Sequence, residues 1–215
     1  MHIFRYDLHL ILEELDVKKY RYPPGVLAKN TEKFRSLTLG KFTLQDSLEH
    51  MPASLDTLVQ DLKNNKNFNF PIVRQMKRYK KMPVRQKTKA LKLLTRKGVF
   101  CYEHFQSLEE MTNARNLPTR EEFYSELNEK HISEADYAFA KNVFTFFKCK
   151  NVTDYMMLYC SLDVALLCET FLQYRNMVME HFQLDPAYYI GKNLIFSKKI
   201  IVTFLIFFRN SRFKF

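Results

Sequence analysis

Tyr159 and Asp163 form a Y-x-x-x-D pair whose residue types suit phosphodiester chemistry. In a helix, residues four positions apart lie on one face, one turn from each other. A carboxylate so placed can bind a divalent metal ion, and a phenol beside it can hold an attacking water or a phosphate oxygen. A core Tyr beside a solvated Asp has the same spacing, so the pair needs support from other residues.

Two other short segments offer groups for the same chemistry. Asp7 follows Tyr6 at the predicted start of a helix, where the helix dipole also favours a carboxylate as a cap. Lys97 lies three positions before Phe100, and a lysine can steady a phosphate oxygen during hydrolysis. Because Lys97 also lies in a long basic segment, neither Asp7 nor Lys97 identifies a site alone.

The positive charge of the chain is concentrated in residues 63–97, called the basic segment below. Between Leu62 and Tyr102 there are 13 Lys or Arg and no Asp or Glu, whereas the whole chain has a net charge of +11. Such a block suits a polyanion, because each neutralised phosphate releases a condensed counterion; a solvated face or loop is the alternative. We predict DNA contacts for Arg74, Lys77, Arg78, Lys80, Lys81, Arg85, Lys87 and Lys89.

The elements that position these residues are predicted to be mostly helices, because 4 Gly and 7 Pro in 215 residues argue against a turn-rich β-sandwich. Ser133 is a predicted N-cap, and it precedes a buried stripe of Tyr137, Ala140, Phe144 and Phe147. Hydrophobic spacing predicts helices at 7–15, 54–62 and 153–181, a strand at 37–44, and a loop at 20–30.

The basic segment shows little hydrophobic periodicity before Ala90, and Pro71 and Pro83 interrupt it. We therefore expect an extended or partly disordered crossing there. Cys160 and Cys168 fall inside an apolar helical pattern, where reduced cysteines behave as small core residues. The four cysteines form no metal-binding spacing.

No signal peptide is visible at the N-terminus, and the apolar run 200–208 is too short to span a bilayer unaided. The sequence therefore predicts no membrane partner.

Several segments, read in order, resemble the exonuclease region of protein-primed family B DNA polymerases. They begin with FTLQDSL at 42–48, SLDTL at 54–58 and RKGVFCYE at 96–103. LPTREEFY at 117–124, ISEADY at 132–137, residues 155–167 and LDPAYY at 184–189 continue the series. The likeness is strongest to polymerases of Maverick/Polinton-type mobile elements and their viral and organellar relatives, and it covers residues 2–190.

This resemblance implies an α/β, helix-rich fold, namely an incomplete ribonuclease-H-like 3′–5′ exonuclease domain. It would occupy residues 1–190 with a basic insertion at 63–97, and residues 191–215 would form a divergent hydrophobic and basic tail. By the resemblance, Asp7 matches the aspartate of the second exonuclease motif, and Tyr159 and Asp163 match the third. Lys97 matches a lysine that assists hydrolysis. Asp7 and Asp163 would be ligands of Mg²⁺, whereas Asp46 would be structural, on a core strand.

The departures from the family pattern concern the metal ligands. No D-x-E and no D-x-D occurs in the sequence, although the first exonuclease motif and the palm motif need them. His2 and Ile3 stand where an Asn is usual before the second motif. We therefore expect a fragment of a DNA-directed DNA polymerase, a nucleotidyltransferase of DNA replication, that is inactive alone. Its expected partner is DNA, as a single-stranded primer end or template. By the resemblance, a terminal protein that acts as primer is a further possible partner of the full-length proteins of this family.

Two alternatives remain open. One is a non-catalytic nucleic-acid-binding module derived from a mobile element, which would bind through the basic segment with strong salt dependence and no need for magnesium. The other is a helical interaction protein whose Phe-rich faces bind a partner, for which association would be insensitive to salt.

Overall fold

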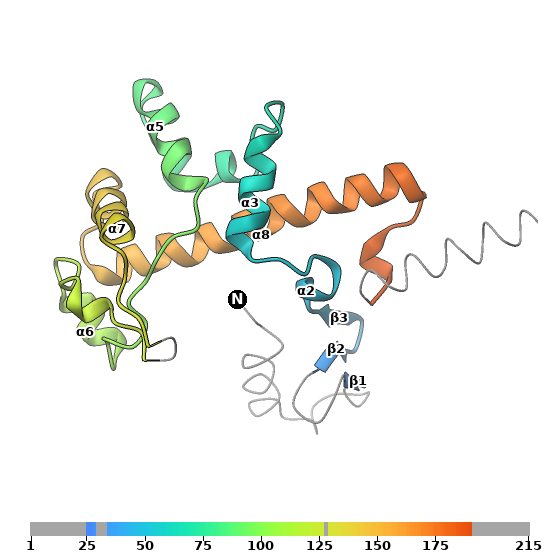
Figure 1. Ribbon diagram of the computed structural model, residues 1–215, viewed down its shortest axis with the longest axis horizontal. Helices are drawn as coiled ribbons and strands as arrows, with labels where there is room; N and C mark the ends of the chain where they lie inside the picture. Colours follow the sequence, from blue (N-terminus) through green and yellow to red (C-terminus); the bar gives the residue numbers. More distant parts are fainter. Residues whose placement is uncertain (1–24, 29–33, 127–128, 191–215) are drawn as a thin grey trace, which may run out of the picture. The chain divides into compact units, whose positions relative to one another are not determined.

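The computed structural model describes residues 25–28, 34–126 and 129–190, and these are rich in helix (Figure 1). The chain divides into two compact units, and each is described separately. The first unit comprises Met1–Ser54 and Phe171–Phe215, and the second comprises Leu55–Thr170. The predicted helix at 7–15, Asp7 and the tail at 191–215 lie outside the described residues.

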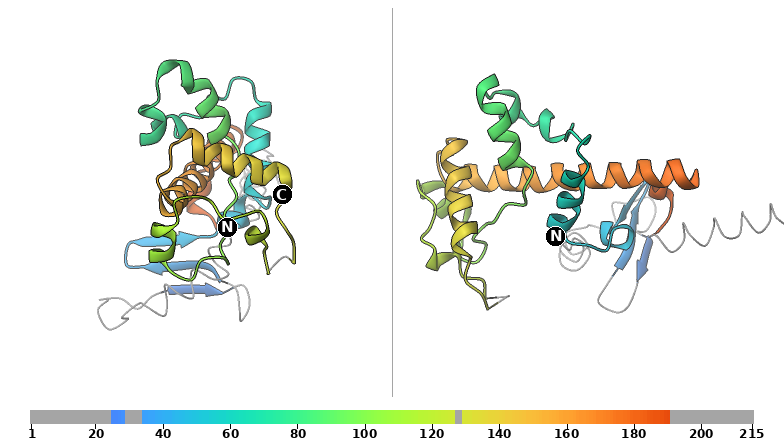
Figure 2. Two further views of the ribbon diagram at one scale, coloured as in Figure 1. Left: turned by 90° about the vertical axis from the view of Figure 1, so that its left-hand side faces the viewer. Right: turned by 45° about the horizontal axis from the view of Figure 1, so that its top comes forward.

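The first unit contains a small antiparallel sheet of strands β1 (Gly25–Ala28), β2 (Phe34–Leu39) and β3 (Phe42–Gln45), which lie side by side in that order (Figure 2). The prediction of one continuous strand at 37–44 is wrong, because Gly40 adopts a positive φ of 60° and turns the chain. Leu37 consequently pairs with Leu44. The predicted loop at 20–30 is also wrong at β1, whose backbone pairs with β2.

Asp46 caps the short helix α2 (Ser47–His50), since the Leu48 N–H donates to its carboxylate at 3.0 Å. Its role is therefore structural, although it follows β3 and does not lie on the strand. His50 is buried between the rings of Phe171 and Tyr174, and burial lowers its pKa.

An ion pair in the first unit joins Arg175 to Asp185. Arg175 donates two hydrogen bonds to the Asp185 carboxylate, at 2.9 and 2.5 Å, and Asp185 begins the 3-10 helix η4 (Pro186–Tyr188).

The second unit packs around one hydrophobic core. Its elements are α3 (Leu55–Asn64), η2 (Val73–Gln75), α4 (Lys77–Lys80), α5 (Val84–Leu94), α6 (Leu108–Asn113), η3 (Glu121–Phe123), α7 (Glu134–Phe146) and the first part of α8 (Val152–Phe182). The helix predicted at 54–62 is confirmed as α3, which buries Val59 and Leu62. Ser133 caps α7 by accepting the Asp136 N–H at 3.0 Å, as predicted. Of the predicted buried stripe, Ala140 and Phe147 are buried, whereas Tyr137 and Phe144 are only half-buried.

The basic segment is packed, so the prediction of an extended or partly disordered crossing is wrong. It contains η2, α4 and α5, and Phe70, Val73, Tyr79 and Leu94 are buried in the core. These apolar residues are too irregularly spaced to give a periodic signal. Pro83 directly precedes α5, where its missing N–H removes no helical hydrogen bond.

A buried carboxylate ties this segment to α8. Glu169 is 2% exposed, and it accepts hydrogen bonds from the N–H groups of Ile72 at 2.6 Å and Val73 at 3.0 Å. The first N–H groups of a helix have no carbonyl partner within the helix, and Glu169 accepts hydrogen bonds from those at the start of η2.

The long helix α8 matches its predicted range to within one residue at each end. Leu158, Leu162 and Leu166 are buried on one side. Cys160 and Cys168 are exposed, so their predicted place in the core is wrong. At 100° per residue they lie on the side of the helix away from the leucines. By length and composition α8 could cross a membrane. Half of its most apolar stretch is buried inside the fold, so the helix is weak evidence for a membrane span.

Candidate nucleic-acid interface

Lys97, Tyr159 and Asp163 lie close together in the second unit. Tyr159 and Asp163 are both 8% exposed, one turn apart on α8. The backbone after Lys97 passes against the Tyr159 ring, because a Cβ on Gly98 would lie 2.8 Å from Tyr159 Cδ2. The ammonium of Lys97 is near enough to lower the pKa of Asp163. The structure thus brings together three of the four predicted catalytic residues, and the fourth, Asp7, lies outside the described residues.

The electrostatics of this group are set by burial. Loss of hydration raises the pKa of Asp163, and hydrogen bonding with the Tyr159 hydroxyl and the charge of Lys97 oppose that rise. One oxygen of Asp163, Oδ1, is buried without a hydrogen-bond partner. Burial also raises the pKa of Tyr159, and contact with Tyr102 and the charge of Asp163 raise it further. Tyr159 is therefore a protonated donor at neutral pH.

Aromatic rings hold this group in place. Phe100 packs against Tyr155 and Tyr159, with ring centroids 6.0 and 5.8 Å apart, and Tyr102 meets the Tyr159 ring edge-on at 5.9 Å. The Tyr155 hydroxyl donates to the Val99 carbonyl at 2.7 Å. These contacts fix the backbone on both sides of Phe100 against α8, which explains how the segment after Lys97 meets Tyr159.

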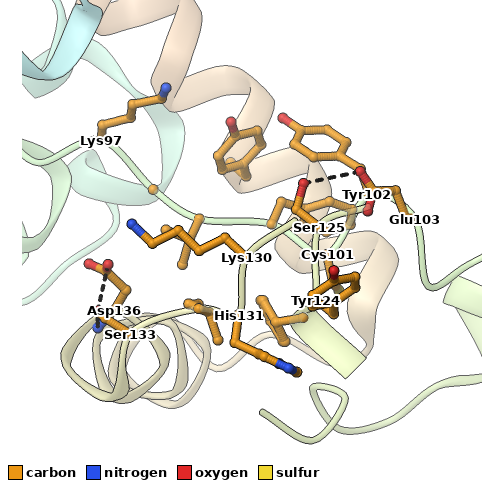
Figure 3. A pocket seen from close by; sticks show the side chains of 16 residues that line it. Lys97, Cys101, Tyr102, Glu103, Tyr124, Ser125, Lys130, His131, Ser133 and Asp136 are labelled. Carbon is orange, nitrogen blue, oxygen red and sulfur yellow. Dashed lines mark hydrogen bonds between the residues drawn. The ribbon is translucent and has the colours of Figure 1, made fainter. Parts of the chain in front are cut away.

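A cavity of about 490 Å³ opens beside Tyr159 and is called the site pocket below (Figure 3). It is lined by residues 97–103, 123–125, 130–133, Asp136 and Tyr159. Figure 3 shows the Lys130 side chain extending toward the side of Asp136, and His131 lying beside Tyr124. The rings of His131 and Tyr124 are 4.8 Å apart.

The two carboxylates that line the site pocket are engaged by the protein itself. Glu103 accepts hydrogen bonds from the Ser125 hydroxyl at 3.2 Å and the Glu126 N–H at 2.5 Å. Asp136 forms an ion pair with Arg96 and accepts the Ser133 hydroxyl at 2.7 Å. Neither Lys97 nor Lys130 has an ion-pair partner among the described residues. The pocket therefore offers free ammonium groups to an anion.

Exposed rings accompany these ammonium groups. Tyr102 is 65% exposed and Tyr124 is 39% exposed, so each can present part of its ring to a ligand. Sequence reasoning missed Lys130, His131 and Tyr124 as pocket residues. The one signal for them is the mixture of aromatic and basic residues between Phe123 and His131, which is too common to identify a site.

Few acidic groups lie near Tyr159 in the described part of the chain. Within residues 25–28, 34–126 and 129–190, no three His, Cys, Asp or Glu side chains lie together in a way that could hold a metal ion. Asp163 offers a single carboxylate, and the groups near it are an ammonium and two phenols. Mg²⁺ commonly takes one or two protein carboxylates together with waters and substrate phosphates, and Asp163 could supply one such ligand.

The predicted DNA-binding cations fall into two groups. Six are exposed on η2, α4, α5 and the turns beside them, namely Arg74, Lys77, Lys80, Lys81, Arg85 and Lys89. Two are half-buried. Arg78 forms an ion pair with Asp154 and donates to the Phe147 carbonyl at 3.1 Å, and the Lys87 ammonium lies 5.7 Å from the centre of the Tyr79 ring. The fold itself therefore uses Arg78. It also uses Arg74, which donates to the Asn69 carbonyl at 2.5 Å and to the Tyr79 hydroxyl at 3.0 Å, and the Lys89 ammonium lies 5.2 Å from the centre of the Phe146 ring. The other four exposed cations are available to a ligand.

One face of α5 is basic along its length. Arg85, Lys89 and Lys92 are exposed at helical spacing, away from the buried Ala90 and Leu94. The pKa of Lys63 is lowered, first by burial and then by the charges of Arg96 and Lys92, against the opposing charge of Asp56. Arg96 and Lys92 therefore lie close enough to Lys63 to act on its charge.

Comparisons of the chain with protein-family models, with curated proteins and with solved structures gave no match. The exonuclease resemblance, the ribonuclease-H-like fold and the magnesium requirement therefore stay predictions.

Proposed function

We propose that this chain is the exonuclease-region part of a DNA-directed DNA polymerase of the protein-primed family B type, and that alone it binds an unpaired DNA end without hydrolysing it. One observation carries this proposal. Lys97 lies more than sixty positions before Tyr159, yet both line the site pocket, and Asp163 lies one turn from Tyr159 on α8. A chance Y-x-x-x-D pair would have no reason to meet the lysine of the other motif.

The residues of the site pocket suit an unpaired nucleotide. The ammonium groups of Lys97 and Lys130 can contact phosphate oxygens, and the protonated Tyr159 hydroxyl can donate a hydrogen bond. Exposed rings such as Tyr102 and Tyr124 can stack on a base, which is how proteins commonly hold single strands. A cavity of about 490 Å³ is within the usual size range of ligand pockets.

Hydrolysis needs more than these groups supply. Two-metal phosphodiester cleavage requires carboxylates around both ions, and Asp163 is the one carboxylate near Tyr159 and Lys97 that remains for this role in the described part of the chain. Lys97 and Tyr159 can position a phosphate, but positioning without an activated nucleophile leaves the bond intact.

The test of inactivity is degradation of an end-labelled single-stranded DNA with magnesium or manganese. The wild-type chain is compared with Asp163→Asn and with Asp61→Asn, which changes an exposed aspartate of α3. We expect no metal-dependent release of 3′ nucleotides from any of them. Release by the wild type and Asp61→Asn, but not by Asp163→Asn, would show an active site and contradict the proposed inactivity.

The test of binding is photo-crosslinking of a single strand that carries a photoreactive 3′-terminal base. Adducts are expected on peptides that contain residues 97–102 and 123–131. Tyr124→Ala should lower their yield several-fold, because a base–ring stack contributes about 1–3 kcal/mol. Tyr188→Ala changes an exposed tyrosine of η4 and should leave the yield unchanged. Adducts confined to peptides outside the site pocket would contradict the proposal.

A second function is favoured by a separate observation. The exposed cations of the basic segment have no carboxylate in the same stretch of sequence, which suits a non-catalytic nucleic-acid-binding module. Binding of this kind should weaken steeply with added salt and should be the same in magnesium and in a chelator. Fluorescence anisotropy of labelled DNA measures both dependences, and a requirement for magnesium would count against this function.

A further inference from the structure

We infer that the basic segment contacts the phosphate backbone of duplex DNA, and that single strands are held elsewhere. This inference rests on the second function above, nucleic-acid binding by the basic segment. It concerns what the exposed groups of η2, α4 and α5 can recognise, and it follows from where the aromatic rings of this segment lie.

The rings of the basic segment are turned inward. Phe70 and Tyr79 are each 5% exposed, and Phe68 is half-buried, with its ring 5.0 Å from that of Phe70. Between Lys63 and Lys97 these are all the aromatic residues. Proteins that bind single strands without sequence preference combine cations with rings on which bases stack. The basic segment therefore presents no exposed ring of its own, and the ring beside Lys89, 5.2 Å from its ammonium, is that of the half-buried Phe146 on α7.

The cations are held in a fixed array. Arg85, Lys89 and Lys92 follow one face of α5 over about 10 Å, from a rise of about 1.5 Å per residue. Tyr79 and Leu94 anchor α4 and α5 in the core, and Glu169 holds η2 on α8. A rigid array suits a duplex, whose phosphates keep fixed spacings and carry one charge per about 1.7 Å of helix axis.

The site pocket provides the contrast within the same unit. There Tyr102 and Tyr124 are exposed beside Lys97 and Lys130, so rings and cations are offered together. Unpaired bases therefore have stacking partners at the pocket and none on the basic segment.

The test compares binding of a short labelled duplex with binding of either separated strand, by fluorescence anisotropy across a salt series. The variant Arg85→Gln/Lys89→Gln/Lys92→Gln removes the basic face of α5. The control Arg115→Gln/Lys148→Gln/Lys150→Gln removes the same number and kinds of charge from exposed positions elsewhere in the second unit. All six side chains are exposed, so both variants should keep the circular dichroism spectrum of the wild type.

The expected result is tighter binding of the duplex than of the single strand. For the duplex, the slope of log K against log salt should become shallower by about 2.7 in the α5 variant, since three phosphate contacts are lost at about 0.9 each. The control should keep the wild-type slope.

Three outcomes would overturn the inference. A single strand that binds as tightly as the duplex, with the same loss of slope in the α5 variant, leaves nucleic-acid binding intact but contradicts the preference for duplex. An equal loss of slope in the control shows that net charge, and not the α5 face, determines binding. Failure of both the duplex and the single strand to bind removes the second function and the inference together.

Discussion

The basic segment and the site pocket both carry lysines, but the aromatic rings beside those lysines are placed differently. In the basic segment Tyr79 is buried beneath Arg74 and Lys87, and their charged groups lie 5.8 and 5.7 Å from the ring centre. In the site pocket, Tyr102 and Tyr124 are exposed. Charge alone determines whether a polyanion is attracted, whereas ring placement determines whether an unpaired base can be retained.

The two regions also differ in what holds them in place. The basic segment depends on a remote carboxylate, Glu169, and on the ion pair between Arg78 and Asp154. The pocket depends on ring packing around Tyr155 and Tyr159. Each region can therefore be disturbed while the other is kept, and the following variants do so, from the largest expected effect to the smallest.

Glu169→Ala should have the largest effect on the basic segment. It leaves the N–H groups of Ile72 and Val73 buried or half-buried without their acceptor, and each lost charged hydrogen bond costs about 1.5–3 kcal/mol. The free energy of unfolding, measured in urea, should fall by about 3 kcal/mol. Glu180→Ala, at an exposed position of the same helix, is the control. A loss below about 0.5 kcal/mol, the usual limit for surface changes, would show that Glu169 does not hold the segment.

Gly98→Ala should act on the pocket instead. The new methyl group would lie 2.8 Å from Tyr159 Cδ2, so the Tyr159 ring or the backbone after Lys97 must move. Overpacking of this kind costs about 1–3 kcal/mol. We expect weaker crosslinking of a single-stranded 3′ end and unchanged salt dependence of duplex binding. Equal losses in both assays would mean that the two regions are not separable.

Arg78→Ala and Lys81→Ala distinguish cations used by the fold from cations available to DNA. Arg78 is engaged by Asp154 and the Phe147 carbonyl, so its loss should lower the free energy of unfolding by about 1–2 kcal/mol. Lys81 is exposed, so its loss should leave stability nearly unchanged and make the salt dependence of duplex binding shallower by about 0.9. A stable Arg78→Ala variant with a shallower salt dependence, beside a destabilised Lys81→Ala variant, would show that Arg78 contacts DNA and that Lys81 supports the fold.

The sequence predicted well those elements whose signals are local. Ser133 as a cap and the regular apolar spacing in α7 and α8 gave their positions to within about one residue. The basic segment was predicted wrongly because its anchors act at long range: Val73 is buried in the core and meets Glu169 almost a hundred positions away. The turn at Gly40 was missed since apolar residues continue on both sides of it.

The residues of the candidate site also differ in whether the sequence alone could suggest them. Lys97, Tyr159 and Asp163 could be chosen from short motifs, because each motif lies on one continuous stretch. Lys130, His131 and Tyr124 could not, because a chain segment with little secondary structure brings them to the pocket. Short motifs can therefore suggest single residues, as for Tyr159 and Asp163 on α8, whereas contacts between distant segments require the structure.

The smallest expected effect concerns pH and arises from Asp163 in the candidate site, whereas the raised pKa of Glu169 gives a separate dependence of the same sign on the side of the basic segment. Burial raises the pKa of Asp163 above its ordinary value of 3.8, so the folded state favours the protonated form. The contribution of Asp163 to stability is therefore greatest below pH 3.8 and is lost as the pH rises through the raised pKa. Hydrogen bonding with Tyr159 and the charge of Lys97 oppose the shift, which keeps the effect small. Asp163→Asn should flatten the fall in the free energy of unfolding over that pH range, whereas Asp61→Asn should keep it. An unchanged pH profile in Asp163→Asn would mean that Asp163 is ionised as readily in the folded chain as in the unfolded one.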